Sequence, residues 1–207
     1  MNRGGNAIAI ETDVSESSSI SNMMKKVVST FGRIDVLVNN VGMSMTVPAI
    51  ELKLDDWNKP LTINLTSYLL CSQEAAKVMI KQGAGKIVNI SSMLADTIIP
   101  NRIGFCVPKA AINHLTKALA IEWAPYKINV NVIGPAYVLT ELIRYLMSKD
   151  LLDEEKLKSR NPFKRFVTTE EVAKAALFFA SSDSEAITGE YMKIDCGWAK
   201  NGGYELF

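Results

Sequence analysis

Residues 91–109 read SSMLADTIIPNRIGFCVPK, and they join two segments of different pattern. The run before them, Lys86–Ile90 (KIVNI), is short and apolar, which is typical of a buried strand. The run after them, Ala110–Trp123, places apolar residues at helical spacing. Two hydroxyl groups therefore follow a strand, and a lysine stands near the start of a helix. Because ligands bind at the carboxyl ends of strands in an open α/β sheet, this stretch is the natural place for a site.

The chain on either side of this stretch alternates between strand and helix patterns. Short apolar runs predict strands over residues 6–14, 34–38, 86–90, 128–133 and 190–195. Helical patterns separate them over residues 15–31, 54–82, 110–123 and 170–180. The run at 34–38 is continuous enough to be buried on both faces. We therefore expect five parallel strands flanked by helices, and no repeat or linker divides residues 1–207, which predicts one domain.

Composition excludes several classes of partner. The formal net charge of +1 gives no reason to expect nucleic acid or an acidic membrane. No apolar run reaches the roughly 18 residues that suggest a membrane span, and the first residues lack the apolar core of a signal peptide. The three cysteines are odd in number and far apart, so they predict neither a disulfide framework nor a metal site. We expect a reducing, cytoplasmic setting.

Six short motifs stand in a fixed order along the chain. They are Asp13-Val14, the turn Asn39–Gly42 (NNVG), Asn64 in the run INLT, the pair Ser92 and Phe105 thirteen residues apart, Lys109 four residues after Phe105, and Asn131–Pro135 (NVIGP) with Val138 and Thr140. In this order they resemble the short-chain dehydrogenase/reductase family, from about Ala7 to Trp198. The resemblance implies a Rossmann-like, doubly wound parallel sheet and NAD or NADP as cofactor.

The resemblance also assigns residues to the cofactor. It implies that Asp13 and Val14 contact adenine. Asn40, Val41 and Gly42 would line the site beside the adenosine part. Pro135, Val138 and Thr140 would hold the nicotinamide end. Lys109 would bind the nicotinamide ribose. The choice between NAD and NADP is not set by these motifs.

Catalysis in the family implies four further roles, one of which this sequence does not fill. Asn64 would hold a water in the proton relay, and Ser92 would orient the carbonyl oxygen. Lys109 would lower the pKa of a tyrosine that supplies the proton. That tyrosine position is Phe105, and a phenyl ring has no proton to give. General acid catalysis is typically worth about 10²–10⁴-fold, so we expect a severe loss of the family's chemistry.

Other departures concern the scaffold. The family's glycine-rich phosphate turn is absent, because no strand precedes Gly4-Gly5. We therefore expect a shortened fold that lacks its first strand–helix–strand unit and leaves the edge of residues 34–38 uncovered, which predicts association there. Ala136 replaces a glycine of the family's turn. Pro60 and Pro108 stand where helix is expected, and the latter disfavours a helical conformation at Val107.

Finer resemblance favours a substrate class. Glu122–Tyr126, Ile133–Leu142 and Gly197-Trp198 resemble gluconate 5-dehydrogenase and related sugar-acid and polyol reductases. One hypothesis is an NAD(P)-dependent oxidoreductase by descent, acting on such a small molecule with reduced or no turnover. The alternative is a non-catalytic family member, either a partner subunit or a decaying gene product. The apolar helices at 54–82 and 109–123 resemble those that form family dimers and tetramers, so a homo-oligomer is expected.

Overall fold

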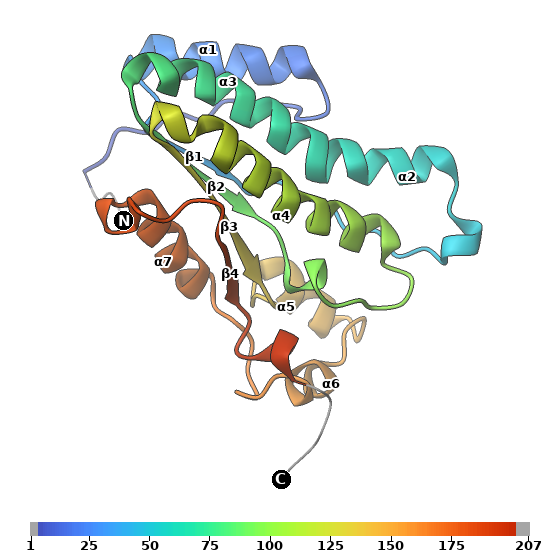
Figure 1. Ribbon diagram of the computed structural model, residues 1–207. Helices are drawn as coiled ribbons and strands as arrows, with labels where there is room; N and C mark the ends of the chain where they lie inside the picture. The colour runs from blue at the N-terminus through green and yellow to red at the C-terminus, as the bar shows by residue number, and fades with distance from the viewer. Residues whose placement is uncertain (1–3, 202–207) are drawn as a thin grey trace.

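The computed structural model describes residues 4–201, in which four parallel strands form one sheet (Figure 1). The strands are β1 Val36–Asn39, β2 Gly85–Ile90, β3 Ile128–Pro135 and β4 Tyr191–Ile194, and they lie side by side in that order. Leu37 is in register with Ile87, which is in register with Val130. The parallel sheet of a Rossmann-like α/β fold is therefore confirmed, with four strands among these residues in place of the predicted five.

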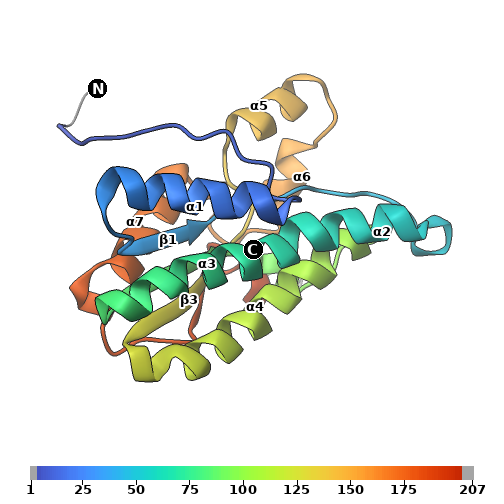
Figure 2. The ribbon, with the colours of Figure 1, turned by 90° about the horizontal axis from the view of Figure 1, so that it is seen from above.

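Seven α-helices of the described chain cover the sheet and its carboxyl edge. They are α1 Ser17–Phe31, α2 Leu54–Leu61, α3 Ser67–Gln82, α4 Ile103–Trp123, α5 Glu141–Ser148, α6 Glu154–Ser159 and α7 Thr169–Ala180. Figure 2 shows α1, α3 and α4 side by side in one layer, and α7 packs on the opposite face. The sheet is thus wound on both sides. Within residues 4–201, no helix combines the length and apolarity needed to cross a membrane.

Alternation along the strands explains the two buried faces. Ile87 and Val130, which are neighbours in register, face the layer of α1, α3 and α4. Val88 and Ile133 point the other way and pack with Phe179 of α7. Successive side chains of a strand point to opposite faces, so a sheet covered on both sides requires the continuous apolar runs seen in the sequence.

The predicted strand at residues 6–14 is wrong. These residues form no strand, and they run past α1 without pairing with the sheet (Figure 2). A strand forms only where an adjacent strand offers unpaired backbone groups at the right spacing. Alternation of apolar and polar residues does not show whether such a strand is present. The apolar alternation here reflects partial burial, since Ile10 is half-buried while Ile8 is exposed.

β1 is a sheet edge, and its predicted burial on both faces is wrong. The side chains of Val36 and Val38 are 37% and 47% exposed. Lys86 donates its backbone N–H to the carbonyl of Asp35 at 2.9 Å, so residues 35, 37 and 39 present their backbone groups to β2. The backbone groups of Val36 and Val38 therefore face the other side, where no strand of the described chain pairs with them.

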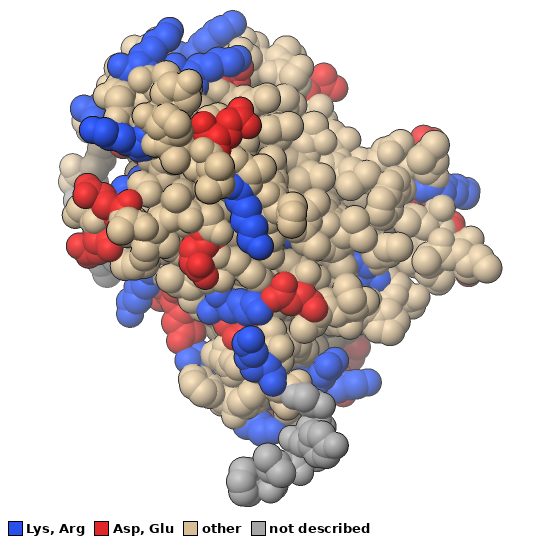
Figure 3. Space-filling view, viewed as in Figure 1, with Lys and Arg blue, Asp and Glu red and all other residues tan. Residues whose placement is uncertain are grey.

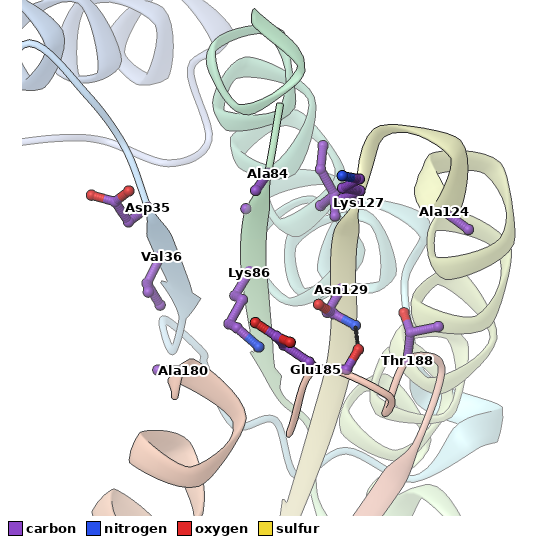
Figure 4. A pocket seen from close by; sticks show the side chains of 12 residues that line it. Asp35, Val36, Ala84, Lys86, Ala124, Lys127, Asn129, Ala180, Glu185 and Thr188 are labelled. Atoms are coloured by element: carbon purple, nitrogen blue, oxygen red, sulfur yellow. Dashed lines mark hydrogen bonds between the residues drawn. The ribbon is translucent and has the colours of Figure 1, made fainter. Parts of the chain in front are cut away.

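A hollow opens beside this edge at the amino ends of the strands (Figure 4). Its volume is about 670 Å³, and Val36, Lys86 and Asn129 contribute to its wall. Asn129 donates to the backbone carbonyl of Glu185 across it, at 3.0 Å. Ligands of open parallel sheets bind at the opposite, carboxyl end of the strands, so this hollow is not the candidate site.

Two helices continue through prolines. α2 runs through Pro60 into a π-helical turn, Thr62–Thr66, and then into α3, so helical structure continues past the proline over the predicted range 54–82. Pro60 is buried against α4, where a Cβ on Gly104 would lie 3.4 Å from the proline ring. α4 begins at Ile103, earlier than the predicted 110, and its residue before Pro108 is helical as well. The expectation of a non-helical Val107 is therefore wrong.

The open edge generates a prediction about association. A charge on an edge strand opposes pairing with another edge, so Val38→Lys should suppress aggregation measured by light scattering at rising protein concentration. Ile121→Lys is the matched control, because Ile121 is 77% exposed on α4 and lies in the region predicted for ordered oligomers. Aggregation that persists in Val38→Lys and disappears in Ile121→Lys would show that the edge is not responsible.

Candidate active site

A cavity of about 400 Å³ opens at the carboxyl ends of β1, β2 and β3, between the start of α4 and α5. Its wall combines residues from the turns after three strands with residues of both helices. The predicted site residues that line it are Asn40, Gly42, Ser92, Phe105, Lys109, Pro135 and Val138. The fold therefore brings most of the predicted site together around one space.

Lys109 lies at the wall of this cavity with its side chain almost entirely covered. The residue is 4% exposed, and its Nζ donates to the carbonyl of Ile90 at 2.8 Å. The hydroxyl of Tyr68 lies 3.5 Å from the same nitrogen. No carboxylate forms an ion pair with Lys109 within residues 4–201. Burial disfavours the charged ammonium and lowers the pKa of Lys109 to about 8.

Tyr68 is a site residue that the sequence interpretation missed. It is 1% exposed, and its hydroxyl lies 2.9 Å from the carbonyl oxygen of Val41 and 3.0 Å from that of Ile90. The single proton of the hydroxyl is donated to one of these two oxygens. Burial raises the pKa of Tyr68, so the phenol keeps that proton. Its spacing of four from Asn64 was the available signal, because residues four apart share one helix face.

Asn64 holds the loop after β1 and does not line the cavity. It is completely buried in the π-helical turn Thr62–Thr66. Its Oδ1 accepts from the backbone N–H of Met43 at 2.7 Å, and its Nδ2 donates to the Met43 carbonyl at 2.9 Å. A π-helical turn of this kind is frequent at functional sites. Here it turns an amide side chain toward a loop that carries site residues.

Gly42 allows that loop to approach Lys109 closely. A Cβ at Gly42 would lie 3.4 Å from Oδ1 of Asn64 and 3.6 Å from Nζ of Lys109. Any larger side chain would therefore fill the space over the ammonium group. Glycine thus keeps this space open to a ligand, which is a common use of glycine beside a binding site.

The two serines after β2 have different partners. Ser91 is buried, and its hydroxyl donates to the backbone carbonyl of Lys109 at 2.7 Å, which ties the strand end to α4. Ser92 accepts from the backbone N–H of Leu94 at 3.1 Å and so caps a short 3₁₀ turn. That bond uses an acceptor of the Ser92 oxygen, so its proton stays available to an oxygen in the cavity.

Phe105 occupies the place where a proton donor is expected. Because α4 begins at Ile103, Phe105 and Lys109 stand one turn apart on the same helix face. Nζ of Lys109 lies 5.8 Å from the centre of the Phe105 ring. The ring contacts the cavity with carbon and hydrogen only, so it shields the ammonium group and donates no hydrogen bond.

Four predicted cofactor residues lie outside this cavity. The carboxylate of Asp13 accepts from the backbone N–H and the hydroxyl of Ser15, and these bonds lower the pKa of Asp13. Thr140 caps α5 by accepting from the backbone N–H of Ile143 at 3.3 Å. Val14 and Val41 line a second cavity, of about 320 Å³, beside β1.

The second cavity shares one wall residue with the first. Val41 lines it together with Asn40, and Asn40 also lines the larger cavity. The turn after β1 thus stands between two spaces that follow one another along the carboxyl edge of the sheet. An elongated ligand lying on this edge would pass over Asn40.

The arrangement fits one half of a nicotinamide dinucleotide. Gly42 leaves room for a ligand above Lys109, and the buried ammonium can donate to a ribose hydroxyl. For the pyrophosphate, the described residues contain no strand that leads through a glycine-rich turn into a helix N-terminus. Residues 4–201 therefore offer a buried donor that can serve a ribose hydroxyl, and no phosphate-binding turn lies among them.

Comparison with known proteins agrees with this geometry. The family model described as enoyl-(acyl carrier protein) reductase matches residues 1–199. The chain is 36% identical to the NAD-dependent glycerol dehydrogenase of Listeria innocua, over 92% of this chain and 74% of that protein.

Two solved structures share the fold. A putative gluconate dehydrogenase from Agrobacterium tumefaciens is 36% identical, with a TM-score of 0.89 over 96% of this chain and 78% of its own. A tyrosine-to-phenylalanine variant of ElxO with NADPH bound is 35% identical, with a TM-score of 0.87 over 91% of this chain and 76% of its own. The fold and these relatives define a family of α/β oxidoreductases. The chain belongs to the short-chain dehydrogenase/reductase family.

Burial of Lys109 generates a prediction about stability and pH. The pKa falls from its ordinary 10.5 to about 8 in the folded chain, so between these values the unfolded chain binds more protons at this lysine. The cost of burying the charge is fully present below pH 8 and disappears as the pH rises toward 10.5. The free energy of unfolding of the native protein, relative to Lys109→Met, should therefore rise by about 3 kcal/mol across this pH range.

Urea unfolding of both proteins across that pH range measures the difference. Lys117→Met is the control, because Lys117 is exposed on the same helix. The prediction is wrong if the difference for Lys109→Met is as independent of pH as the difference for Lys117→Met.

Proposed function

We propose that this chain is an NAD(P)-dependent oxidoreductase by descent, acting on a sugar-acid, polyol or similar carbonyl/alcohol pair with severely reduced turnover. The observation that carries the proposal is the cavity in which Ser92 and Lys109 flank Phe105. The names of two relatives, a glycerol dehydrogenase and a putative gluconate dehydrogenase, support the substrate class.

The cofactor role is assigned to residues that surround Lys109. Lys109 would bind the nicotinamide ribose, and Gly42 would leave room for it. Asn40 would lie beside the adenosine part, and Pro135 and Val138 would contact the nicotinamide end. When bound, the dinucleotide supplies or accepts the hydride. The NADPH-bound variant of ElxO supports this assignment, because a relative that carries a tyrosine-to-phenylalanine change still holds NADPH.

The remaining residues would position the substrate. The Ser92 hydroxyl donates to the carbonyl oxygen and fixes its orientation, and the positive charge of Lys109 favours electron density on that oxygen. Phe105 excludes water from the space between them and moves no proton. None of the predicted site residues therefore delivers the proton, and the loss of that step reduces turnover by about 10²–10⁴-fold.

The second candidate function is a non-catalytic member of the family. Phe105 supports it, because a phenyl ring has no proton to give. In this proposal the chain serves as a partner subunit or is the product of a decaying gene. The two proposals differ in whether the cofactor binds and in whether a restored proton donor restores turnover.

We also infer a homo-oligomer in the cytoplasm. Ile103, Val107 and Ile121 expose apolar side chains on α4. Figure 3 shows few charged side chains over the α2–α3 junction and the middle of α4, compared with the end of the molecule near α1. An apolar, weakly charged helix face supports self-association. All three cysteines are unpaired, which supports a reducing compartment.

Cofactor binding is the first prediction from this proposal. Titration with NADPH and NADH, followed by nucleotide fluorescence, should give micromolar binding to at least one of them. Lys109→Met should weaken that binding at least tenfold, because it removes the donor to the ribose. Dissociation constants above about 1 mM for both nucleotides would contradict the cofactor assignment.

Restoring the proton donor is the second prediction. Phe105→Tyr should raise the rate of NADP⁺ or NAD⁺ reduction with gluconate or glycerol by about 10²-fold or more, because it supplies the missing acid–base group. Phe163→Tyr is the control, since Phe163 is exposed and lies outside the cavity wall. Cofactor binding without any gain in Phe105→Tyr would favour the non-catalytic proposal.

A further inference from the structure

The candidate active-site cavity has a wall made largely of hydrocarbon. Six of its apolar side chains come from three segments: Met43, Met93, Leu94, Leu142, Ile143 and Leu146. A buried hydroxyl of a ligand that finds no hydrogen-bond partner costs free energy. A polyhydroxylated ligand would therefore meet few groups that can satisfy it over this part of the wall.

The polar groups of the wall are mostly engaged with the protein itself. The Ser91 hydroxyl donates to the Lys109 carbonyl, and Ser92 accepts from Leu94. Ser44 accepts a hydrogen bond from the guanidinium of Arg102. The capacity that remains lies at Ser92, where the reacting oxygen would lie, at the Asn40 amide and the Tyr137 hydroxyl, and at two cations.

Arg102 is the second of these cations, and neither its sequence pattern nor the family resemblance pointed to it. It stands at the N-cap of α4, is half-buried, and lines the cavity together with its partner Ser44. No aspartate or glutamate lines this cavity, and no carboxylate pairs with Arg102 within residues 4–201. Its positive charge thus has no counter-ion in the part of the chain that the structure describes.

The spacing along α4 places Arg102 at one end of a row. Arg102, Phe105 and Lys109 are separated by three and four residues, so they share one helix face. With a rise of about 1.5 Å per residue, Arg102 lies roughly 4.5 Å along the axis from Phe105 and roughly 10 Å from Lys109. A ligand whose reacting carbon lies beside Ser92 and Phe105 would reach Arg102 within a few bonds.

We propose that this cavity selects an anionic substrate with a hydrocarbon body, an oxo or hydroxy acid whose carboxylate pairs with Arg102. The inference rests on the proposed function. Among the carbonyl/alcohol pairs named there, it favours apolar oxo or hydroxy acids over polyols and sugar acids. A guanidinium matches a carboxylate with two parallel hydrogen bonds. The pairing supplies the missing counter-ion, while the six apolar side chains cover the hydrocarbon.

Binding of three probes tests the proposal without requiring turnover. They are 3-hydroxyhexanoate, hexane-1,3-diol, which keeps the hydroxyl but has no charge, and gluconate, which keeps the charge on a polyhydroxylated body. Calorimetric titrations are made with and without NADPH. We expect 3-hydroxyhexanoate to bind at least tenfold more tightly than either of the other two.

Variants of Arg102 locate the effect. Arg102→Gln should weaken the binding of 3-hydroxyhexanoate at least tenfold and leave the affinities for the diol and for NADPH unchanged. Arg102→Lys should recover part of the lost affinity. Arg144→Gln is the matched control, because it removes the same charge from α5 at a position outside the cavity wall. Arg144→Gln should leave the affinities for all three probes unchanged.

Equal affinity for the acid and the diol would overturn the proposal, as would gluconate binding as tightly as 3-hydroxyhexanoate. An Arg102→Gln variant that binds the acid normally would also overturn it. These failures are distinguishable from a failure of the proposed function, which would appear as absent NADPH binding. Because the probes are also titrated without the nucleotide, the preference for the acid is measured in either case.

Discussion

The site depends on burying the ammonium group of Lys109 without a carboxylate beside it. Such a charge is tolerated only where dipoles replace water, and here the carbonyl of Ile90 and the hydroxyl of Tyr68 do so. Gly42 carries no side chain, so the space over the ammonium group stays open to a ligand. Ser91 fixes the backbone of the same lysine. One buried charge thus lies where four segments meet: the loop after β1, α3, the end of β2 and α4.

A buried polar network places these segments relative to one another. Asn39 at the end of β1 donates to Ser72 of α3 and to the side chain of Asn89 in β2. Asn89 in turn donates to Thr116 of α4. Each donor would cost free energy if the register of strand or helix shifted, so the network specifies a single arrangement of the layer beneath the site. The precision of the cavity therefore derives from polar groups below it as well as from the apolar core.

The sequence predicted the features that depend on residues close together in the chain, and it failed on those that depend on distant ones. Apolar periodicity reports local burial, so the strands at β2 and β3 and the helix α7 were predicted within a few residues. Residues 6–14 and the exposure of Val36 were mispredicted, because pairing and edge position depend on neighbours distant in sequence. Tyr68 was missed because an aromatic residue within a predicted helix is usually part of the hydrophobic core. Arg102 was missed because the start of α4 follows an irregular stretch and includes a proline.

Phenylalanine at position 105 removes proton delivery without removing the groups that would bind the cofactor. An ammonium group has three donors, and residues 4–201 provide Lys109 with two acceptors, the Ile90 carbonyl and the Tyr68 hydroxyl. A phenyl ring at 105 leaves the third donor to a ligand, while a phenol would compete for it. Loss of the tyrosine therefore removes proton delivery but leaves Lys109 able to hold a hydroxyl group. By this argument, affinity for a nicotinamide ribose is expected to survive in a site whose turnover is lost, so binding and turnover have to be measured separately.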